Sequence, residues 1–353
     1  MSISTFVVKF LDELYLAARR YNMSRYSFGH IKNKYNKNIL TKEQKKAIRD
    51  FYMPYGKVST EFHSFYIDKT SLFSEKYIPD YIYFNRVNTY FNDNKVAKIM
   101  DNKCYYDMLF YGYKQPIKLA DRKGGCWFVG GQMVTLEQVL DVLCEEPAIF
   151  IKAATSSSGG GGVRYIDKAV CDDFRCSIKK VVEQMAVDVV IQKPIIQHKD
   201  LSRLNESSVN TMRILTVLRN GKVKIYSSLL RIGKANSKVD NGAISVGITD
   251  DGKLKRYGYY LTGDRVISHP GSGVVLKDYQ LPSFDKAKNM VLKAHLCVPH
   301  FKMVSWDIAI GEDGEPILIE ANLSDGEVLF HQLNNGPLFG DDTKEILDEV
   351  FGK

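Results

Sequence analysis

Trp306-Asp307-Ile308-Ala309-Ile310 and Ile317-Leu318-Ile319-Glu320-Ala321-Asn322 are two apolar runs, separated by a turn at residues 311–316 that is rich in Gly, Asp and Pro. Such runs on either side of such a turn predict a β-hairpin. Glu320 and Asn322 are two residues apart, so they share one face of the second strand. Folding of the hairpin brings Asp307, in the first strand, opposite them.

The polar side chains of this hairpin suit a magnesium ion. Mg²⁺ takes a few oxygen ligands from a protein and completes its octahedron with water and phosphate, and two carboxylates with an amide oxygen supply such ligands. A surface hairpin with solvated acidic side chains is the alternative interpretation. The metal site is favoured because Glu320 stands between Ile319 and Ala321 and is followed by an asparagine, Asn322, of the kind that binds metals.

The composition is that of a globular protein. The chain has 353 residues, of which 44% are hydrophobic and 25% are charged, and this length allows two or three domains. It has no apolar run as long as a transmembrane helix requires, and residues 1–15 lack the features of a signal peptide. The six cysteines form no CxxC pair, and we expect them to be reduced thiols of a cytoplasmic protein.

Positive charge is concentrated in the N-terminal third of the chain. Residues 1–125 carry 22 Lys and Arg against 12 Asp and Glu, whereas the remainder carries 27 against 29. A basic, Tyr-rich region favours an acidic partner, such as a nucleic acid, an anionic polymer, a phosphorylated substrate or an anionic membrane face; a solvated basic surface is the alternative. No nucleic-acid-binding motif is present, so no nucleic-acid partner is expected.

A run of serine and glycine at residues 156–162 lies between two apolar segments that are predicted strands, 148–152 and 163–166. The run has the composition of a flexible linker, but a domain linker is not usually held directly between two strands. A hairpin with a glycine-rich tip fits better, because its backbone N–H groups can approach phosphate oxygens closely. Lys152, at the end of the first strand, is placed to meet the same anion.

Periodicity and turn signals predict an α+β protein whose second half is antiparallel sheet with covering helices. Helices are expected at residues 3–20, 42–52, 85–90, 96–100, 101–110, 135–143, 172–186, 282–297 and 342–351. Further strands are expected at residues 62–67, 81–84, 116–119, 189–196, 210–217, 223–232, 243–248 and 254–260. Pro194 ends or bends the strand at 189–196, which indicates a hinge or a domain boundary.

The order of these features resembles that of the ATP-grasp superfamily. It runs from Lys103 at a helix start, through Lys152 and the glycine-rich hairpin, to Arg213 and Arg231 on paired strands and then to the final hairpin. The segments 210–214, 240–242, 306–309 and 320–322 look most like the sugar-transfer-associated ATP-grasp proteins, which are found with polysaccharide and capsule biosynthesis genes. The resemblance covers residues from about 40 to 330.

The resemblance implies a fold in which two α+β subdomains clamp ATP. Residues 1–95 would be a basic, Tyr-rich N-terminal region, 96–193 the subdomain with the glycine-rich flap, and 194–353 the subdomain with the Mg²⁺ site. The implied metal ligands are Asp307, Glu320 and Asn322. The implied ATP contacts are the two phosphate-binding lysines, the flap and the hinge strand beside adenine: Lys103, Lys152, Ser157, Ser158, Gly159, Gly160, Gly161, Gly162, Gln192, Lys193 and Pro194. Relatives commonly carry a glutamate near the hinge, where this chain has Gln192.

The reaction implied by the resemblance is the ligation of a carboxylate to an amine through an acyl phosphate. The substrates would be an amine and a small-molecule or glycan carboxylate. An anionic polysaccharide precursor is one such carboxylate. Arg213 and Arg231 are candidates to hold the acyl phosphate or the carboxylate, because a guanidinium binds such groups through two parallel hydrogen bonds; surface ion pairs are the alternative. Asp240 and Asn241 either line the acceptor pocket or are turn residues.

Two other functions stay open. An ATP-grasp phosphotransferase acting on a sugar hydroxyl would use the same ATP and Mg²⁺ site. A non-enzymatic polyanion-binding protein would instead use the basic N-terminal region and would bind its polymer with a steep salt dependence.

Overall fold

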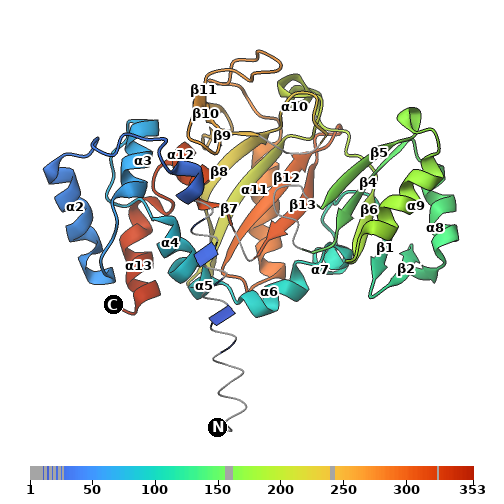
Figure 1. The fold of residues 1–353 in the computed structure, drawn as a ribbon, viewed down its shortest axis with the longest axis horizontal. Coiled ribbons are helices and arrows are strands. Elements are labelled where there is room, and N and C mark those ends of the chain that lie inside the picture. The colour runs from blue at the N-terminus through green and yellow to red at the C-terminus, as the bar shows by residue number, and fades with distance from the viewer. Residues whose placement is uncertain are drawn as a thin grey trace, which may run out of the picture.

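The computed structural model of the chain describes residues 28–155, 162–238, 243–323 and 326–353, together with seven residues between 11 and 25. The helix expected at residues 3–20 therefore lies largely outside the described residues. The described chain is mixed α and β, as the sequence predicts, and its strands form two antiparallel sheets (Figure 1). The larger sheet lies in the middle of the molecule, with the smaller sheet on one side and N-terminal helices on the other.

The smaller sheet has six strands in the order β3-β2-β1-β6-β4-β5. Its elements are β1 (Lys118–Lys123), β2 (Cys126–Val129), β3 (Gln132–Val134), β4 (Ala148–Ala153), β5 (Val163–Asp167), β6 (Val189–Gln192) and the covering helices α8 (Leu136–Cys144) and α9 (Phe174–Gln184). The fully buried Leu140, Ile149, Ile178 and Ile191 belong to one core between the sheet and these helices. Helix α8 begins at a capping box formed by Thr135 and Gln138.

The larger sheet has seven strands in the order β11-β10-β9-β8-β7-β12-β13. Its strands are β7 (Thr211–Arg219), β8 (Lys222–Ile232), β9 (Ile244–Ile248), β10 (Leu254–Tyr259), β11 (Arg265–Val266), β12 (Met303–Ile310) and β13 (Pro316–Asn322). The opening hairpin is therefore β12 and β13, at one edge of this sheet. Strand β7 lies directly beside β12 although it comes about 90 residues earlier in the chain.

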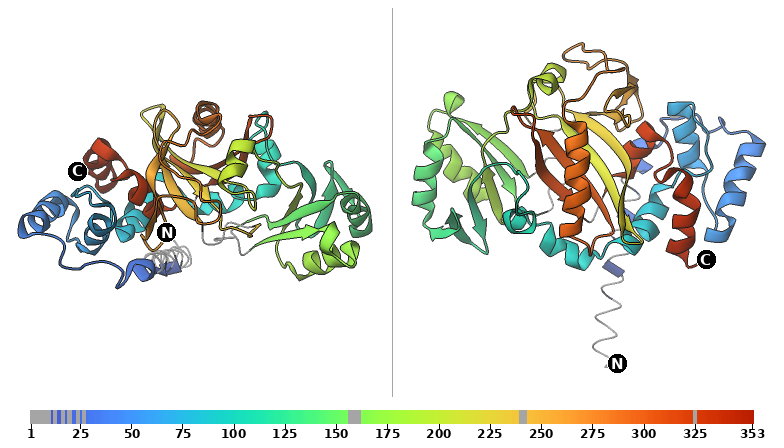
Figure 2. Two further views of the ribbon diagram at one scale, coloured as in Figure 1. Left: turned by 90° about the horizontal axis from the view of Figure 1, so that it is seen from above. Right: turned by 180° about the vertical axis from the view of Figure 1, so that it is seen from behind.

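The two faces of the larger sheet carry different side chains. Helix α11 (Phe284–Ala294) covers one face, seen from behind in Figure 2, and packs there on apolar residues that include Ile214 and Trp306. Helix α12 (Val328–Asn335) covers part of the other face and packs on Leu229. Because successive residues of a strand point to opposite faces, Arg213 and Asp307 lie on the face away from α11.

The remaining helices flank the larger sheet. They are α2 (Lys42–Tyr52), α3 (Glu61–Thr70), α4 (Asp80–Ile82), α5 (Asn88–Phe91), α6 (Asn94–Met100), α7 (Tyr106–Leu109), α10 (Lys199–Leu204) and α13 (Thr343–Phe351). Helix α2 matches its predicted range and begins at a capping box of Thr41 and Gln44. The six-residue strand β1 begins two residues later than the strand expected at 116–119, and β6 ends at Gln192 rather than at residue 196.

Two predicted strands are wrong. Residues 62–67 belong to helix α3, and residues 81–84 belong to α4 and the π-helical turn Tyr83–Val87 that follows it. Aromatic residues favour strands, but the aromatic residues here lie in a helix whose five consecutive residues 62–66 are all buried. Tertiary packing around the whole helix decides the conformation. Strands β2 and β3 and helices α10 and α12 were not predicted.

Candidate active site

The hairpin brings the three predicted metal ligands together. Asp307 of β12 lies opposite Glu320 of β13, and Ser305 lies opposite Asn322. The Asn322 Nδ2 atom donates to the Ser305 carbonyl at 3.0 Å and to Asp307 Oδ2 at 3.4 Å. The register shifts after Asp307, so that Ile319 is an extra residue in β13. A bulge of this kind re-aims neighbouring side chains and is common beside functional sites.

Arg213 is the direct cross-strand partner of Asp307. The two residues are opposite each other in β7 and β12, and the guanidinium binds the carboxylate through two hydrogen bonds, Nε to Oδ1 and Nη2 to Oδ2, each of 2.8 Å. The Nη1 atom of Arg213 lies 2.9 Å from Glu327 Oε2, and that oxygen lies 3.7 Å from Nη1 of Arg231. We refer to Arg213, Arg231, Asp307 and Glu327 as the arginine cluster.

The arginine cluster keeps its buried acid ionised. Burial works to raise the pKa of Asp307, but the charge and hydrogen bonds of Arg213, with smaller contributions from Arg231 and Asn322, hold that pKa below its usual value. A carboxylate that stays charged while buried is suited to bind a cation.

Two lysines meet the other acid of the hairpin. Lys103 Nζ lies 2.8 Å from Glu320 Oε1, and the Lys103 backbone N–H donates to the Ala154 carbonyl just beyond β4. Lys152, in β4, is close enough to both groups for their charges to affect it. Burial lowers the pKa of Lys152 to about 8; Glu320 works against this shift and Lys103 adds to it. We refer to Lys103, Lys152 and Glu320 as the lysine cluster.

The other predicted ATP contacts lie around the base of the β4–β5 hairpin and the end of β6. The Ala153 backbone N–H donates to the Gly162 carbonyl at 2.9 Å. Gln192 lies between Lys118 of β1 and Phe150 of β4 in the sheet. Lys193 is in an ion pair of 2.6 Å with Glu146, and Pro194 follows it beyond the strand. Ser157, Ser158, Gly159, Gly160 and Gly161, like Asp240 and Asn241, lie outside the described residues.

Two residues beside the site were not predicted from the sequence, Glu327 and His331. His331 of α12 is 1% exposed, and its Nδ1 lies 2.7 Å from Ser227 Oγ, whereas its Nε2 has no hydrogen-bond partner among the described residues. Burial and the charge of Arg213 lower the pKa of His331 to about 3, so the imidazole is neutral. Glu327 directly precedes helix α12, and His331 belongs to it. The sequence gives no amphipathic signal for this helix.

The donor set of the hairpin fits a hard divalent cation such as Mg²⁺. Asp307 and Glu320 provide carboxylate oxygens, and Asn322 carries an amide beside them whose Nδ2 faces Asp307, so a half-turn of that amide would present its oxygen to a cation. Within the described ranges no group of three His, Cys, Asp or Glu side chains is placed to hold a metal ion.

The described part of the chain also contains no helix that is long and apolar enough to cross a bilayer.

Comparison with protein families identifies the family of the chain. The model of the sugar-transfer associated ATP-grasp family matches residues 85–346, which include both clusters. The chain belongs to this family. No curated protein matches the chain.

Solved structures similar to this ATP-grasp protein share little sequence with it. An ADP complex of N5-carboxyaminoimidazole ribonucleotide synthetase is 11% identical over 66% of this chain and 50% of that chain, with a TM-score of 0.41. The D-alanine–D-alanine ligase of Coxiella burnetii is 12% identical over 74% and 58%, with a TM-score of 0.42. The biotin carboxylase domain of the Hydrogenobacter thermophilus 2-oxoglutarate carboxylase, in complex with ADP, its magnesium salt and bicarbonate, is 12% identical over 73% and 47%, with a TM-score of 0.45. This chain thus spans about half of the length of these structures.

Proposed function

We propose that this protein is an ATP-dependent ligase that joins a carboxylate to an amine through an acyl phosphate, with a sugar acid or glycan precursor of polysaccharide or capsule biosynthesis as its acid substrate. The proposal is supported above all by the pairing of Asp307 with Glu320, in which Glu320 contacts Lys103 of the lysine cluster and Asp307 contacts Arg213 of the arginine cluster. The family membership supports the proposal independently.

The lysine cluster is the proposed site for the phosphates of ATP. Lys103 is paired with Glu320, and Lys152 lies near enough for both charges to affect it, so the cluster has an excess of positive charge in a place where burial disfavours the charge of Lys152. A bound phosphate would neutralise this excess. The flap at residues 157–162 would lie over the phosphates, and Gln192, Lys193 and Pro194 would lie beside adenine. The division of the chain at residues 95 and 193 is part of the same proposal.

The hairpin is the proposed metal site. Asp307, Glu320 and Asn322 would hold Mg²⁺, which when bound neutralises phosphate charge and so favours phosphoryl transfer. Arg213 keeps Asp307 oriented through two hydrogen bonds, and Lys103 does the same for Glu320 through one. These hydrogen bonds would orient the two carboxylates before a cation binds.

The arginine cluster is the proposed site for the reacting carboxylate. Arg213 and Arg231 come from neighbouring strands and share Glu327, which holds their guanidinium groups side by side. Two adjacent guanidinium groups can orient a carboxylate for attack on phosphorus and then hold the acyl phosphate while an amine attacks its carbonyl carbon. In the second step the amine nitrogen forms a bond to the carbonyl carbon and gives up one proton to solvent, while the bond from that carbon to the phosphate oxygen breaks and phosphate departs. Because all six cysteines are free thiols, we place this reaction in the cytoplasm.

The direct test is product analysis. Purified protein with ATP, Mg²⁺, candidate uronic acids and candidate amines is expected to release ADP and phosphate and to form an amide, and Glu320→Gln is expected to abolish this turnover. ATP binding without ADP and phosphate release for any acid and amine pair would contradict the ligase. Phosphorus NMR separates the ligase, which frees phosphate, from a phosphotransferase, whose product keeps it.

A further inference from the structure

A loop of the larger sheet contacts the smaller sheet. Residues 233–238, which we refer to as the β8 loop, follow directly after β8. At the end of this loop the exposed Lys238 places its Nζ atom 5.6 Å from the centroid of the Tyr165 ring. Tyr165 belongs to β5, an edge strand of the smaller sheet. An ammonium group over an aromatic ring at this distance is a cation–π contact, and here it joins the two sheets.

The contact lies next to the proposed phosphate site. Tyr165 is the cross-strand partner of Phe150 in β4, and their ring centroids are 5.0 Å apart. The Nζ atom of Lys152 lies 5.8 Å from the centroid of the Phe150 ring. The Tyr165 hydroxyl donates to Asp167 Oδ2 at 3.0 Å, which holds the ring in place on β5. The β8 loop therefore meets the smaller sheet one strand away from the lysine cluster.

A buried histidine holds the base of the β8 loop. His269 is 2% exposed, and its Nε2 atom lies 3.0 Å from the carbonyl oxygen of Gly233. Because a carbonyl oxygen only accepts, Nε2 carries the proton in this bond. The Ser272 backbone N–H donates to the other ring nitrogen, Nδ1, at 3.2 Å. One tautomer of the ring therefore ties residues 269–272 to the first residue of the loop.

Two further hydrogen bonds hold the same region. Ser272 Oγ donates to the Leu204 carbonyl at the end of α10 at 2.8 Å. Within the β8 loop, the Asn236 backbone N–H donates to Ser207 Oγ at 2.9 Å. The loop is thus attached at its start and in its middle, so it presents Lys238 to the smaller sheet without a ligand.

The smaller sheet is attached to the larger one at a different strand. Residues 193–198, which follow β6, bind the β12–β13 hairpin, where the His198 N–H donates to the Ile310 carbonyl at 2.9 Å and the Glu312 N–H donates to the Ile196 carbonyl at 3.0 Å. In the order of the smaller sheet, β5 lies two strands from β6. Rotation about the attachment after β6 would carry β5 away from the β8 loop, so the cation–π contact resists this opening.

We infer that the β8 loop is a latch that holds the smaller sheet over bound nucleotide, with Lys238 as its contact residue and His269 as its positioning residue; this inference rests on the proposed function. A nucleotide held between the two sheets leaves when they separate, and separation breaks the contact between Lys238 and Tyr165. The latch therefore acts on the rate of nucleotide release. A cation–π contact at an exposed position is weak, so the expected effect on this rate is about threefold.

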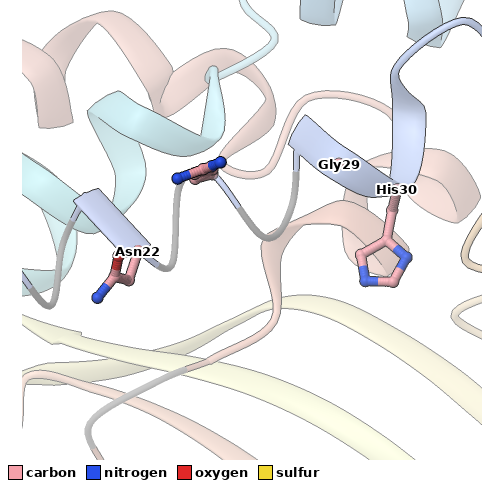
Figure 3. Close-up of a pocket in the computed structure, with 4 residues that line it drawn as sticks. Asn22, Gly29 and His30 are labelled. Atoms are coloured by element: carbon pink, nitrogen blue, oxygen red, sulfur yellow. The ribbon is translucent and has the colours of Figure 1, made fainter.

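Gly271 allows the β8 loop to be displaced without changing either contact residue. A Cβ atom at this position would lie 2.5 Å from the Cβ atom of Ala235 in the loop, and the Gly271 backbone is not left-handed. Gly271→Ala therefore pushes on the loop itself. Gly29→Ala is the matched control, because a Cβ atom there would meet no atom of the described chain within 4 Å. Gly29 lies on the N-terminal helical turn drawn in Figure 3.

The experiment measures the rate at which a fluorescent ADP analogue leaves the full chain in the presence of Mg²⁺, by stopped-flow displacement with excess ADP. We expect Lys238→Met, Gly271→Ala and His269→Ala to release the analogue about threefold faster than wild type. Lys238→Arg, which keeps a cation over the ring, and His269→Gln, which keeps an N–H donor, should release it at the wild-type rate, as should Gly29→Ala. In a Tyr165→Leu background, Lys238→Met should cause no further acceleration, because the ring that it contacts is already absent.

The inference would be overturned by wild-type release from Lys238→Met, or by equal acceleration from Lys238→Met with and without the Tyr165 ring. The same release rate in Gly271→Ala as in Gly29→Ala would also overturn it. Each of these results is obtained with protein that still binds the analogue, so the latch can fail while the proposed nucleotide site stands. No binding of the analogue to wild type would instead remove the proposed function, and the latch with it.

Discussion

The arginine cluster and the lysine cluster meet at the Asp307–Glu320 pair but are built differently. The arginine cluster has two guanidinium groups and two carboxylates, all from the larger sheet and the residue before α12. The lysine cluster has two ammonium groups and one carboxylate, and it joins β4 of the smaller sheet to β13 of the larger one. One cluster is balanced in charge, whereas the other carries an excess positive charge.

This difference indicates two roles. A balanced and hydrogen-bonded cluster keeps its geometry without a ligand, because each buried charge already has a partner. A cluster with excess charge, in which burial lowers the pKa of Lys152 to about 8, is stabilised when an anion arrives. We therefore expect changes in the arginine cluster to act mainly on stability and orientation, and changes in the lysine cluster to act mainly on nucleotide affinity.

The largest expected effect is the loss of stability in Asp307→Asn. This change leaves Arg213, whose side chain is 11% exposed, without its charged partner, and breaking such a buried pair costs about 3 kcal/mol of unfolding free energy. The stabilisation by Asp307 is present at neutral pH and is lost as the pH falls through its lowered pKa. Urea denaturation measures both effects.

A surface pair provides the control for this prediction. Lys46 and Asp50 form an ion pair whose side chains are 73% and 49% exposed, so Asp50→Asn should change the unfolding free energy by less than about 1 kcal/mol. If Asp307→Asn were no less stable than Asp50→Asn, the arginine cluster would not be the rigid part of the site.

The second prediction is a gain, rather than a loss, of unfolding free energy. Lys152→Met should raise the unfolding free energy of the ligand-free protein, by on the order of 2 kcal/mol at pH 7, while it removes most of the affinity for ATP. The pKa of Lys152 is about 8 in the folded chain and 10.5 in the unfolded chain. Between pH 8 and pH 10.5 the folded state therefore binds fewer protons than the unfolded state. The destabilisation by this charge is complete below pH 8 and fades towards pH 10.5, and the gain in the variant should fade with it.

Urea denaturation from pH 7 to pH 10.5 and nucleotide titration test this prediction together. Lys46→Met, at an exposed position, is the control and should change neither quantity. A ligand-free Lys152→Met protein that is less stable than wild type at pH 7 would show that the lysine cluster is already satisfied without an anion.

The smallest expected effect is that of Glu327→Gln. The exposed fraction of the Glu327 side chain is 31%, so solvent screens its pairs with the two arginines. Loss of its charge should misplace the guanidinium groups and lower kcat/KM by about tenfold, with the affinity for ADP and Mg²⁺ unchanged. Glu345→Gln in α13, which removes an exposed ion pair with Arg219, is the control. Equal losses in nucleotide affinity and kcat/KM would place Glu327 in the nucleotide site instead.

The hairpin could be predicted from the sequence because its signals are local. The two apolar runs and the composition of the turn are enough to predict the hairpin, whereas the bulge at Ile319 that puts Asp307 opposite Glu320 has no local signal in the sequence. The pairing of Arg213 with Asp307 depends on β7 lying beside β12, and these strands are too far apart in the chain for a local pattern to show it.

Helix α12 could not be predicted for a different reason. Every residue of Val328–Asn334 is buried, including His331 and Gln332, so the helix has no polar face and no helical periodicity in its sequence. Glu327 and His331, which flank the arginines, were missed as a result. Similarly, α3 was mistaken for a strand because the packing of its aromatic side chains, rather than their intrinsic preference, decides its conformation.

The most direct test of the account is calorimetric titration of wild type and Glu320→Gln with ADP, each with and without Mg²⁺. Glu320 links the proposed metal ligands to the lysine cluster, so we expect that Mg²⁺ strengthens ADP binding to wild type and that this gain disappears in Glu320→Gln, whereas metal-free ADP binding persists. The same gain from Mg²⁺ in Glu320→Gln as in wild type would contradict the assignment of the hairpin as the metal half of the ATP site.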